Sequence, residues 1–278
     1  MIRAFKLEWL KIRHYKVFWI LFGLYLLTQF VITNGGTFLL EWLESKGADF
    51  DGIQPSIVPI YDFPDIWQNS VWLASFPKVL VSFIVVVSVN NELTYNTLRQ
   101  NIIDGISKKE FLLSKFSLII FIAAVCTLFL FITALITGLT YSHVTDVKYI
   151  FSEIDYIFSY FLQIIAFCLF AFCVGLVIKK AGFAIVFILI YSIFQLIITS
   201  ILQFSDWTKD YMADYVKFFP LYSIEKLTGK VYESPFARYL LQEIKTDIFW
   251  YEYLIVFAWI GIFCGFITYL LNKKDLKA

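Results

Sequence analysis

The sequence predicts an all-α polytopic membrane protein with six transmembrane helices, and its composition and charge pattern both lead to this fold class. Hydrophobic residues make up 60% of the 278-residue chain and charged residues only 16%, whereas about 25% of a soluble globular chain is charged. The charges also gather in short clusters between long apolar stretches. An ordinary soluble domain is therefore excluded.

The apolar stretches are the expected spans, because a helix needs about 20 mostly apolar residues to cross a bilayer. They cover residues 15–33, 71–89, 117–140, 156–178, 183–204 and 253–271 of a single transmembrane domain, 1–278. The second stretch is interrupted by Pro77 and Lys78, and the remaining Val79–Val89 is too short to cross alone. Lys78 lies near its outer end, where the side chain can reach the interface.

The first stretch is expected to be a retained span, because bulky Phe38-Leu39-Leu40 follow it where a signal-peptide cleavage site needs small residues. The outer loop, 34–70, then holds a short apolar-faced segment, Thr37–Lys46, ended by Gly47. Three prolines follow, which predict irregular chain.

The basic residues predict the orientation. Fourteen Lys and Arg fall in the N-terminal segment, the second and fourth loops and the C-terminal tail, whereas the opposite short loops hold two lysines and many acidic residues. By the positive-inside rule, both termini are expected in the cytoplasm, and the protein is expected in a cell inner membrane.

The long outer connection, 205–252, is expected to hold two short amphipathic helices. They are indicated by Ser234-Pro235 before Phe236–Lys245 and by the spacing of Trp207, Tyr211, Tyr215 and Phe218.

The N-terminal residues 1–14 predict an amphipathic helix along the inner leaflet. Phe5, Trp9 and Ile12 fall on one face, and the basic side chains fall on the other. Such a helix could serve only as an anchor and orientation signal, or it could link a cytoplasmic partner to the first span.

The segment 90–116 predicts a compact cytoplasmic hairpin. Asn91–Ile103 can continue the second helix, Asp104-Gly105 can end it, and Ser107 with Glu110 forms a capping box for the next helix. Its apolar edge, Leu98, Ile102 and Ile103, suits a docking surface, although a solvated hairpin is the alternative.

The chain lacks the groups that membrane enzymes use. It has only two histidines, His14 and His143, and no hydrolase, zinc-protease or phosphate-binding motif. The four cysteines lie in apolar stretches, so neither a metal site nor a disulfide framework is expected, and no basic face suggests nucleic acid. An ion-coupled transporter is disfavoured because the spans hold no charge except Lys78.

The polar and small residues within the spans predict helix packing. Gln29, Gln163, Gln195 and Gln203 are expected to join helices by hydrogen bonds. Gly261 and Gly265 form a G-x-x-x-G in the sixth span, which allows close approach of another helix or occurs there by chance.

The 90–116 segment resembles the permease of type-two ABC exporters, a class that includes bacterial drug, antibiotic-immunity and polysaccharide or lipid exporters. The resemblance rests on Glu92, Thr97, Leu98, Arg99, Gly105, Ser107, Lys108, Glu110, Phe111, Leu112, Leu113 and Lys115. Lys108 stands where that family often has arginine. Phe5–Lys11 resembles the family's opening helix, and Phe219-Pro220-Leu221 resembles its proline-bearing step after the fifth span.

The resemblance implies two permeases and two cytoplasmic ATPase subunits, with Leu98–Ile103 as the coupling helix seated in the ATPase. ATP and Mg would be bound by the ATPase, so this chain would contribute no cofactor and no catalytic residue. The expected cargo is a hydrophobic or amphipathic drug, peptide antibiotic, lipid or glycan. The alternative function is a non-transporting scaffold or sensor that docks a cytoplasmic partner through the same hairpin.

Overall fold

The computed structural model describes residues 2–47, 60–95, 97, 100, 103, 105–144, 146–204, 215–229 and 248–273, and in these it contains helices and no strand. The helices are α1 Ile2–Ile12, α2 Lys16–Ser45, α3 Ile66–Ala74, α4 Lys78–Thr94, α6 Lys108–Tyr141, α7 Val147–Ile150, α8 Asp155–Val177, α9 Ala181–Phe204, α11 Pro220–Lys226 and α13 Trp250–Lys273.

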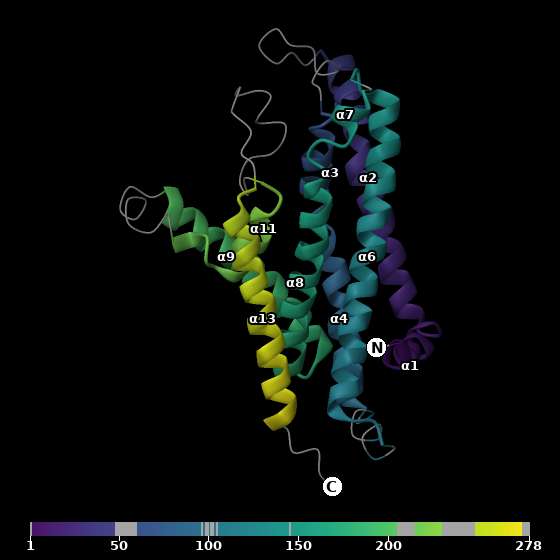
Figure 1. Cartoon of the computed structure of the whole chain (residues 1–278), viewed down its shortest axis with the longest axis vertical. Coiled ribbons are helices and arrows are strands. Elements are labelled where there is room, and N and C mark those ends of the chain that lie inside the picture. The colour runs from purple at the N-terminus through teal and green to yellow at the C-terminus, as the bar shows by residue number, and fades with distance from the viewer. Residues whose placement is uncertain are drawn as a thin grey trace.

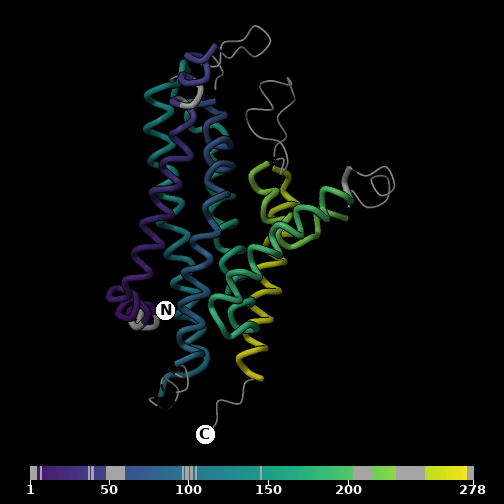
Figure 2. The backbone as a smooth tube through the Cα atoms, turned by 180° about the vertical axis from the view of Figure 1, so that it is seen from behind, coloured from purple at the N-terminus to yellow at the C-terminus, as the bar shows by residue number. Residues whose placement is uncertain are grey.

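The long helices form one elongated bundle around α8. Most residues of α8 are buried, and it packs against α4, α6 and α13. Helix α2 lies beside α4 and beside α6, whereas α9 runs obliquely away from the bundle (Figures 1 and 2). The start of α1, the start of α6 and the end of α13 lie at the same end of the molecule, which we call the basic end.

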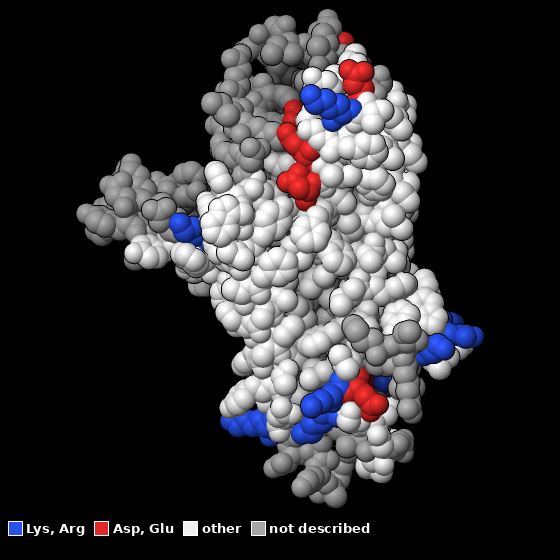
Figure 3. All heavy atoms as spheres, in the orientation of Figure 1, with Lys and Arg blue, Asp and Glu red and all other residues white. Residues whose placement is uncertain are grey.

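Five described helices are long and apolar enough to span a membrane, and the pair α3 and α4 gives a sixth candidate. This pair is bent by 44°, at the interruption that Pro77 predicted, because proline has no backbone N–H to continue the helix. On the face shown in Figure 3, basic side chains are most numerous at the basic end, and a broad uncharged surface separates them from acidic side chains at the other end.

The helix of the first predicted span is longer than expected, and the expectation of a separate Thr37–Lys46 segment in the outer loop was wrong. α2 continues through Asn34-Gly35-Gly36 to Ser45. The Tyr61 hydroxyl stabilises this stretch, because it donates to the Thr33 carbonyl and accepts from the Gly36 backbone N–H, both at 3.0 Å. Gly36 is required here, since a Cβ would clash with the Tyr61 hydroxyl.

The helix that leads from the second predicted span toward the 90–116 segment ends earlier than expected. α4 ends at Thr94 and Tyr95 is a turn, so Asn91–Ile103 is not one continuous helix. The side chains of Asn90, Asn91 and Thr94 belong to residue types that favour a helix weakly. Beyond the turn, the capping box is confirmed, because the Ser107 hydroxyl accepts from the Glu110 backbone N–H at 3.2 Å and the Glu110 carboxylate accepts from the Ser107 N–H at 2.9 Å. Gly105 has a φ of +93°, as a glycine stop allows.

The outer connection folds back onto the bundle through α11, which has proline at its first position. The two predicted amphipathic helices fall largely on 205–214 and 230–247, outside the described residues. Tyr215 and Phe218 are described and both are exposed.

The sequence suggested that the Lys78 side chain reaches the interface, and this expectation was wrong. Lys78 is 3% exposed, and its ammonium lies 2.6 Å from both carboxylate oxygens of Glu225 in α11. No local pattern indicates this contact, because the two residues lie 147 positions apart.

The glutamine prediction is confirmed at two positions. The Gln163 amide donates to Glu225 at 3.3 Å, and the Gln195 side chain accepts from the Leu221 backbone N–H, so both tie spans to α11. The prediction is wrong for Gln29, which is buried with no hydrogen-bond partner among the described residues. The Gln203 side chain lies outside the description.

We predict that Glu225→Gln lowers the melting temperature of the purified protein more than Lys78→Met does. Removing the carboxylate leaves an ammonium that is 3% exposed without its counter-charge, and breaking a buried pair in this way costs about 3–5 kcal/mol. Removing the lysine leaves a carboxylate whose side chain is 31% exposed and can be hydrated. Thermal unfolding in detergent measures both, and the opposite order would contradict the buried pair.

Candidate functional site

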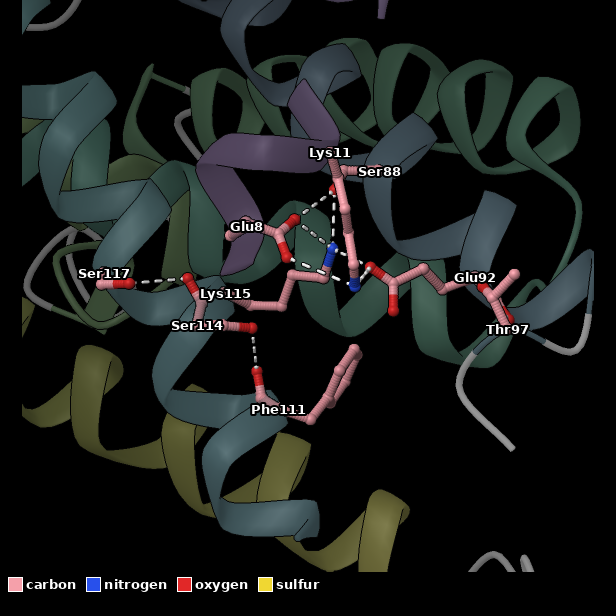
Figure 4. Close-up of polar contacts among 9 residues, drawn as sticks. All are labelled: Glu8, Lys11, Ser88, Glu92, Thr97, Phe111, Ser114, Lys115 and Ser117. Atoms are coloured by element: carbon pink, nitrogen blue, oxygen red, sulfur yellow. Dashed lines mark hydrogen bonds and ion pairs between the residues drawn. The ribbon is translucent and has the colours of Figure 1, made fainter. Parts of the chain in front are cut away.

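Five polar residues from three helices meet at the basic end, and we call them the inner ionic cluster: Glu8 and Lys11 of α1, Ser88 and Glu92 of α4, and Lys115 of α6 (Figure 4). The Lys115 ammonium donates to Glu8 at 2.5 Å, to Glu92 at 2.6 Å and to Ser88 at 2.7 Å. Lys11 reaches the same Glu92 oxygen at 3.2 Å. Lys115 therefore joins three helices through one side chain.

The local sequence explains how each helix presents its charge. The capping box starts α6 at Lys108, which brings Lys115 two turns into that helix. On α1, the rings of Phe5 and Trp9 pack on Phe121 of α6, with centroids 5.3 and 5.5 Å apart. The predicted apolar face of residues 1–14 thus contacts the protein itself, and Glu8 is carried into the contact between α1 and α6.

Three charged members of the cluster are buried, which makes their charges depend on one another. Glu8 is 1% exposed, Lys115 2% and Glu92 6%. Burial alone would raise the pKa of the Glu8 carboxyl, but the charge of Lys115 and its hydrogen bond outweigh burial and hold that pKa below its ordinary value of 4.5. Since the pKa is lowered, this stabilisation is complete at neutral pH and is lost only as the pH falls below 4.5, through the folded-state pKa.

The predicted docking residues separate into buried and exposed groups. Glu92 lies beneath the surface, whereas Thr97, Ile103 and Gly105 are exposed. Ile103 is an apolar side chain with 74% exposure, and docking through it stays a prediction. Leu98, Arg99 and Ile102 lie outside the described residues.

Lys108 makes a contact that the sequence did not suggest. Its ammonium donates to the Leu271 carbonyl at 2.9 Å and to the Asn272 carbonyl at 3.5 Å. These are terminal carbonyls of α13, where a cation is favoured by the helix dipole. The start of α6 is therefore tied to the last helix.

The glycine pair of α13 has no packing partner among the described residues. A Cβ at Gly261 or Gly265 would meet nothing within 4 Å. Close approach of another helix at Gly261 and Gly265 therefore stays a prediction, and the space beside them is open to a helix of another chain.

Sequence reasoning included Glu92 as a site residue but missed Glu8, Lys11, Ser88 and Lys115. Glu8, Lys11 and Lys115 appeared only as positions of a motif. The available signal was a lone acidic residue in an otherwise basic N-terminal helix, and a lysine followed at once by an uncharged stretch. Neither signal identifies a partner.

A second polar feature lies toward the other end of the bundle. A cavity of about 270 Å³ has the Lys78 and Glu225 pair on its wall, and its apolar lining includes Trp72, Phe76, Phe167, Leu196 and Tyr222. We call it the outer cavity. The described residues contain no group of three or more His, Cys, Asp or Glu that could hold a metal ion.

We predict that Lys115→Met strongly destabilises the protein, because it leaves the Glu8 and Glu92 carboxylates buried without their shared cation. The expected cost is about 3–5 kcal/mol, seen as a lower melting temperature. Lys109→Met, an exposed lysine of the same helix, is the control. Adding Glu8→Gln to Lys115→Met should recover part of the loss, and equal melting of the two lysine variants would contradict the cluster's role.

The family model described as ABC-2 family transporter protein matches residues 4–195, which is more than half of the chain. The match includes most of α1 and all of α4 and α6, and therefore the whole inner ionic cluster. No curated protein compared with the chain matches it. The chain belongs to the ABC-2 transporter family, as a membrane-spanning permease of the type-two ABC exporter class.

Proposed function

We propose that the chain is the permease subunit of an ATP-driven exporter, working with two cytoplasmic ATPase subunits and a second permease. ATP and Mg bind to the ATPase subunits in this proposal, and the permease supplies the route through the membrane. The inner ionic cluster is the observation that carries it, because it gives a mechanical connection between the 90–116 segment and the spans.

The connection runs from both sides of the 90–116 segment. Glu92 lies near its start on α4 and Lys115 near its end on α6. The Lys115 ammonium lies 2.6 Å from the Glu92 Oε1. Glu8 adds α1 to the same contact, and Lys108 adds the end of α13. A force applied to the segment therefore acts on four helices together, which is how a rigid element transmits a domain movement.

The outer cavity supports an amphipathic cargo. Its wall combines aromatic and aliphatic side chains with one ion pair and the Gln195 amide. Pockets of this composition bind ligands with a large apolar body and a few polar groups. A drug, peptide antibiotic or lipid has that character.

We predict that the basic end faces the cytoplasm of an inner membrane, with both termini there. A cysteine replacing His143, which is exposed at the opposite end, should react with an impermeant thiol reagent added to intact cells. A cysteine replacing Lys109 should react only after the cells are opened. Labelling of the second variant in intact cells would contradict this orientation.

We predict that Ile103→Asp abolishes copurification of the ATPase subunit while membrane abundance stays normal. An unpaired charge in a desolvated interface costs about 2–5 kcal/mol, and Ile103 is 74% exposed in this chain, so folding does not depend on it. Ile103→Leu is the matched control and should retain the ATPase. Full retention by the aspartate variant would refute docking through this residue, and a copurifying partner without ATPase activity would favour the scaffold alternative.

A further inference from the structure

A second cavity, of about 190 Å³, lies at the basic end between α1, the start of α2 and the end of α4. We call it the inner cavity. Its walls differ in character: Glu8, Lys11 and Glu92 line one part, and Phe18, Leu21 and Ile84 line another. A polar region and an apolar region in one cavity suit an amphiphile.

Two residues that line the polar part, Glu8 and Glu92, each have one buried acceptor that the described protein does not satisfy. Glu8 and Glu92 both use their Oε1 atoms to bind Lys115. Their Oε2 atoms are buried and have no hydrogen-bond partner among the described residues, and the Lys11 ammonium lies 3.8 Å from the Glu8 Oε2, too far for a hydrogen bond. Figure 4 shows the second Glu92 oxygen directed away from Lys115 and Lys11. A buried carboxylate oxygen left without a donor is costly, so a donor from outside the chain would be bound favourably.

The chemistry of the donor follows from the charges. A carboxylate oxygen that lacks a donor binds a cationic N–H donor more strongly than a neutral one, and a primary ammonium has three N–H groups available for the two acceptors. Lys11 is the partly exposed cation of the cavity, with 42% of its side chain accessible. It is placed to attract an anionic group attached to the same ligand.

We propose that the inner cavity binds a phospholipid with a primary-amine headgroup, of the phosphatidylethanolamine type. The ammonium lies against Glu8 and Glu92, the phosphate is near Lys11, and an acyl chain covers Phe18, Leu21 and Ile84. The bound lipid fills the space between α2 and α4 beside the inner ionic cluster, so the stability of the cluster depends on the lipid composition of the membrane. This inference concerns binding alone and does not rest on the proposed transport.

The test compares lipids that share acyl chains and differ at the amine. Dioleoyl-phosphatidylethanolamine and its mono-, di- and trimethylated forms are titrated onto the purified full chain in detergent, with occupancy measured by native mass spectrometry. Affinity should fall along the series, by at least tenfold between the primary amine and the trimethylated form, because the trimethylated amine has no N–H for either carboxylate and the loss of a single charge-assisted hydrogen bond already gives about tenfold. Equal affinity for all four would overturn the proposal.

A pair of variants locates the site. Val17 lines the inner cavity and Ile20, on the same helix, does not. Both are exposed, at 41% and 66%, so tryptophan is tolerated at either position. Val17→Trp should abolish the preference for the primary amine and Ile20→Trp should retain it. A preference that survives Val17→Trp would overturn this location.

A displacement experiment distinguishes a phospholipid from a simple cationic amphiphile. Oleylamine has the ammonium and the chain but no phosphate for Lys11. It should displace the phosphatidylethanolamine at least tenfold less effectively than the lipid itself does, by about the same single-bond estimate. Displacement at equal concentration would show that the site takes amines in general and would overturn the lipid assignment.

Discussion

A lysine ammonium cannot be held at 2% exposure without compensating charges, and this constraint organises the basic end of the protein around Lys115. Its partners come from α1 and α4, 107 and 23 residues away. If either carboxylate were absent, the remaining charges would be desolvated without full compensation. The N-terminal helix, the end of α4 and the start of α6 therefore have to be together for any of the three to be stable.

The same physics recurs toward the other end of the bundle. Lys78 is buried at the start of α4, and Glu225 reaches it from α11. α4 thus has an ion pair near each end, one to the outer connection and one to α1 and α6. Directional contacts therefore hold α4 at its bend with α3 and at its far end.

Both cavities border these ion pairs. The inner cavity adjoins Glu8 and Glu92 and the outer cavity adjoins Lys78 and Glu225. A ligand in either cavity would contact residues that hold the helices together.

The sequence by itself determined the class of fold and the start and end of most helices, because these follow from local properties. The length of apolar stretches predicted α6, α8, α9 and α13 to within about ten residues, Pro77 predicted the break between α3 and α4, and Ser107 with Glu110 predicted the cap of α6. The Glu92 to Lys115 motif also indicated the family, because its residues are close together along the chain.

Only the tertiary structure decided which charges pair and where the chain leaves space. Glu8 and Lys115, or Lys78 and Glu225, are joined by the way whole helices pack, and no spacing along the sequence encodes that contact. The continuous α2 likewise depends on Tyr61, which reaches it from a distant turn. Local patterns specify what each segment can form, whereas the cost of burying charge without a partner selects which segments meet.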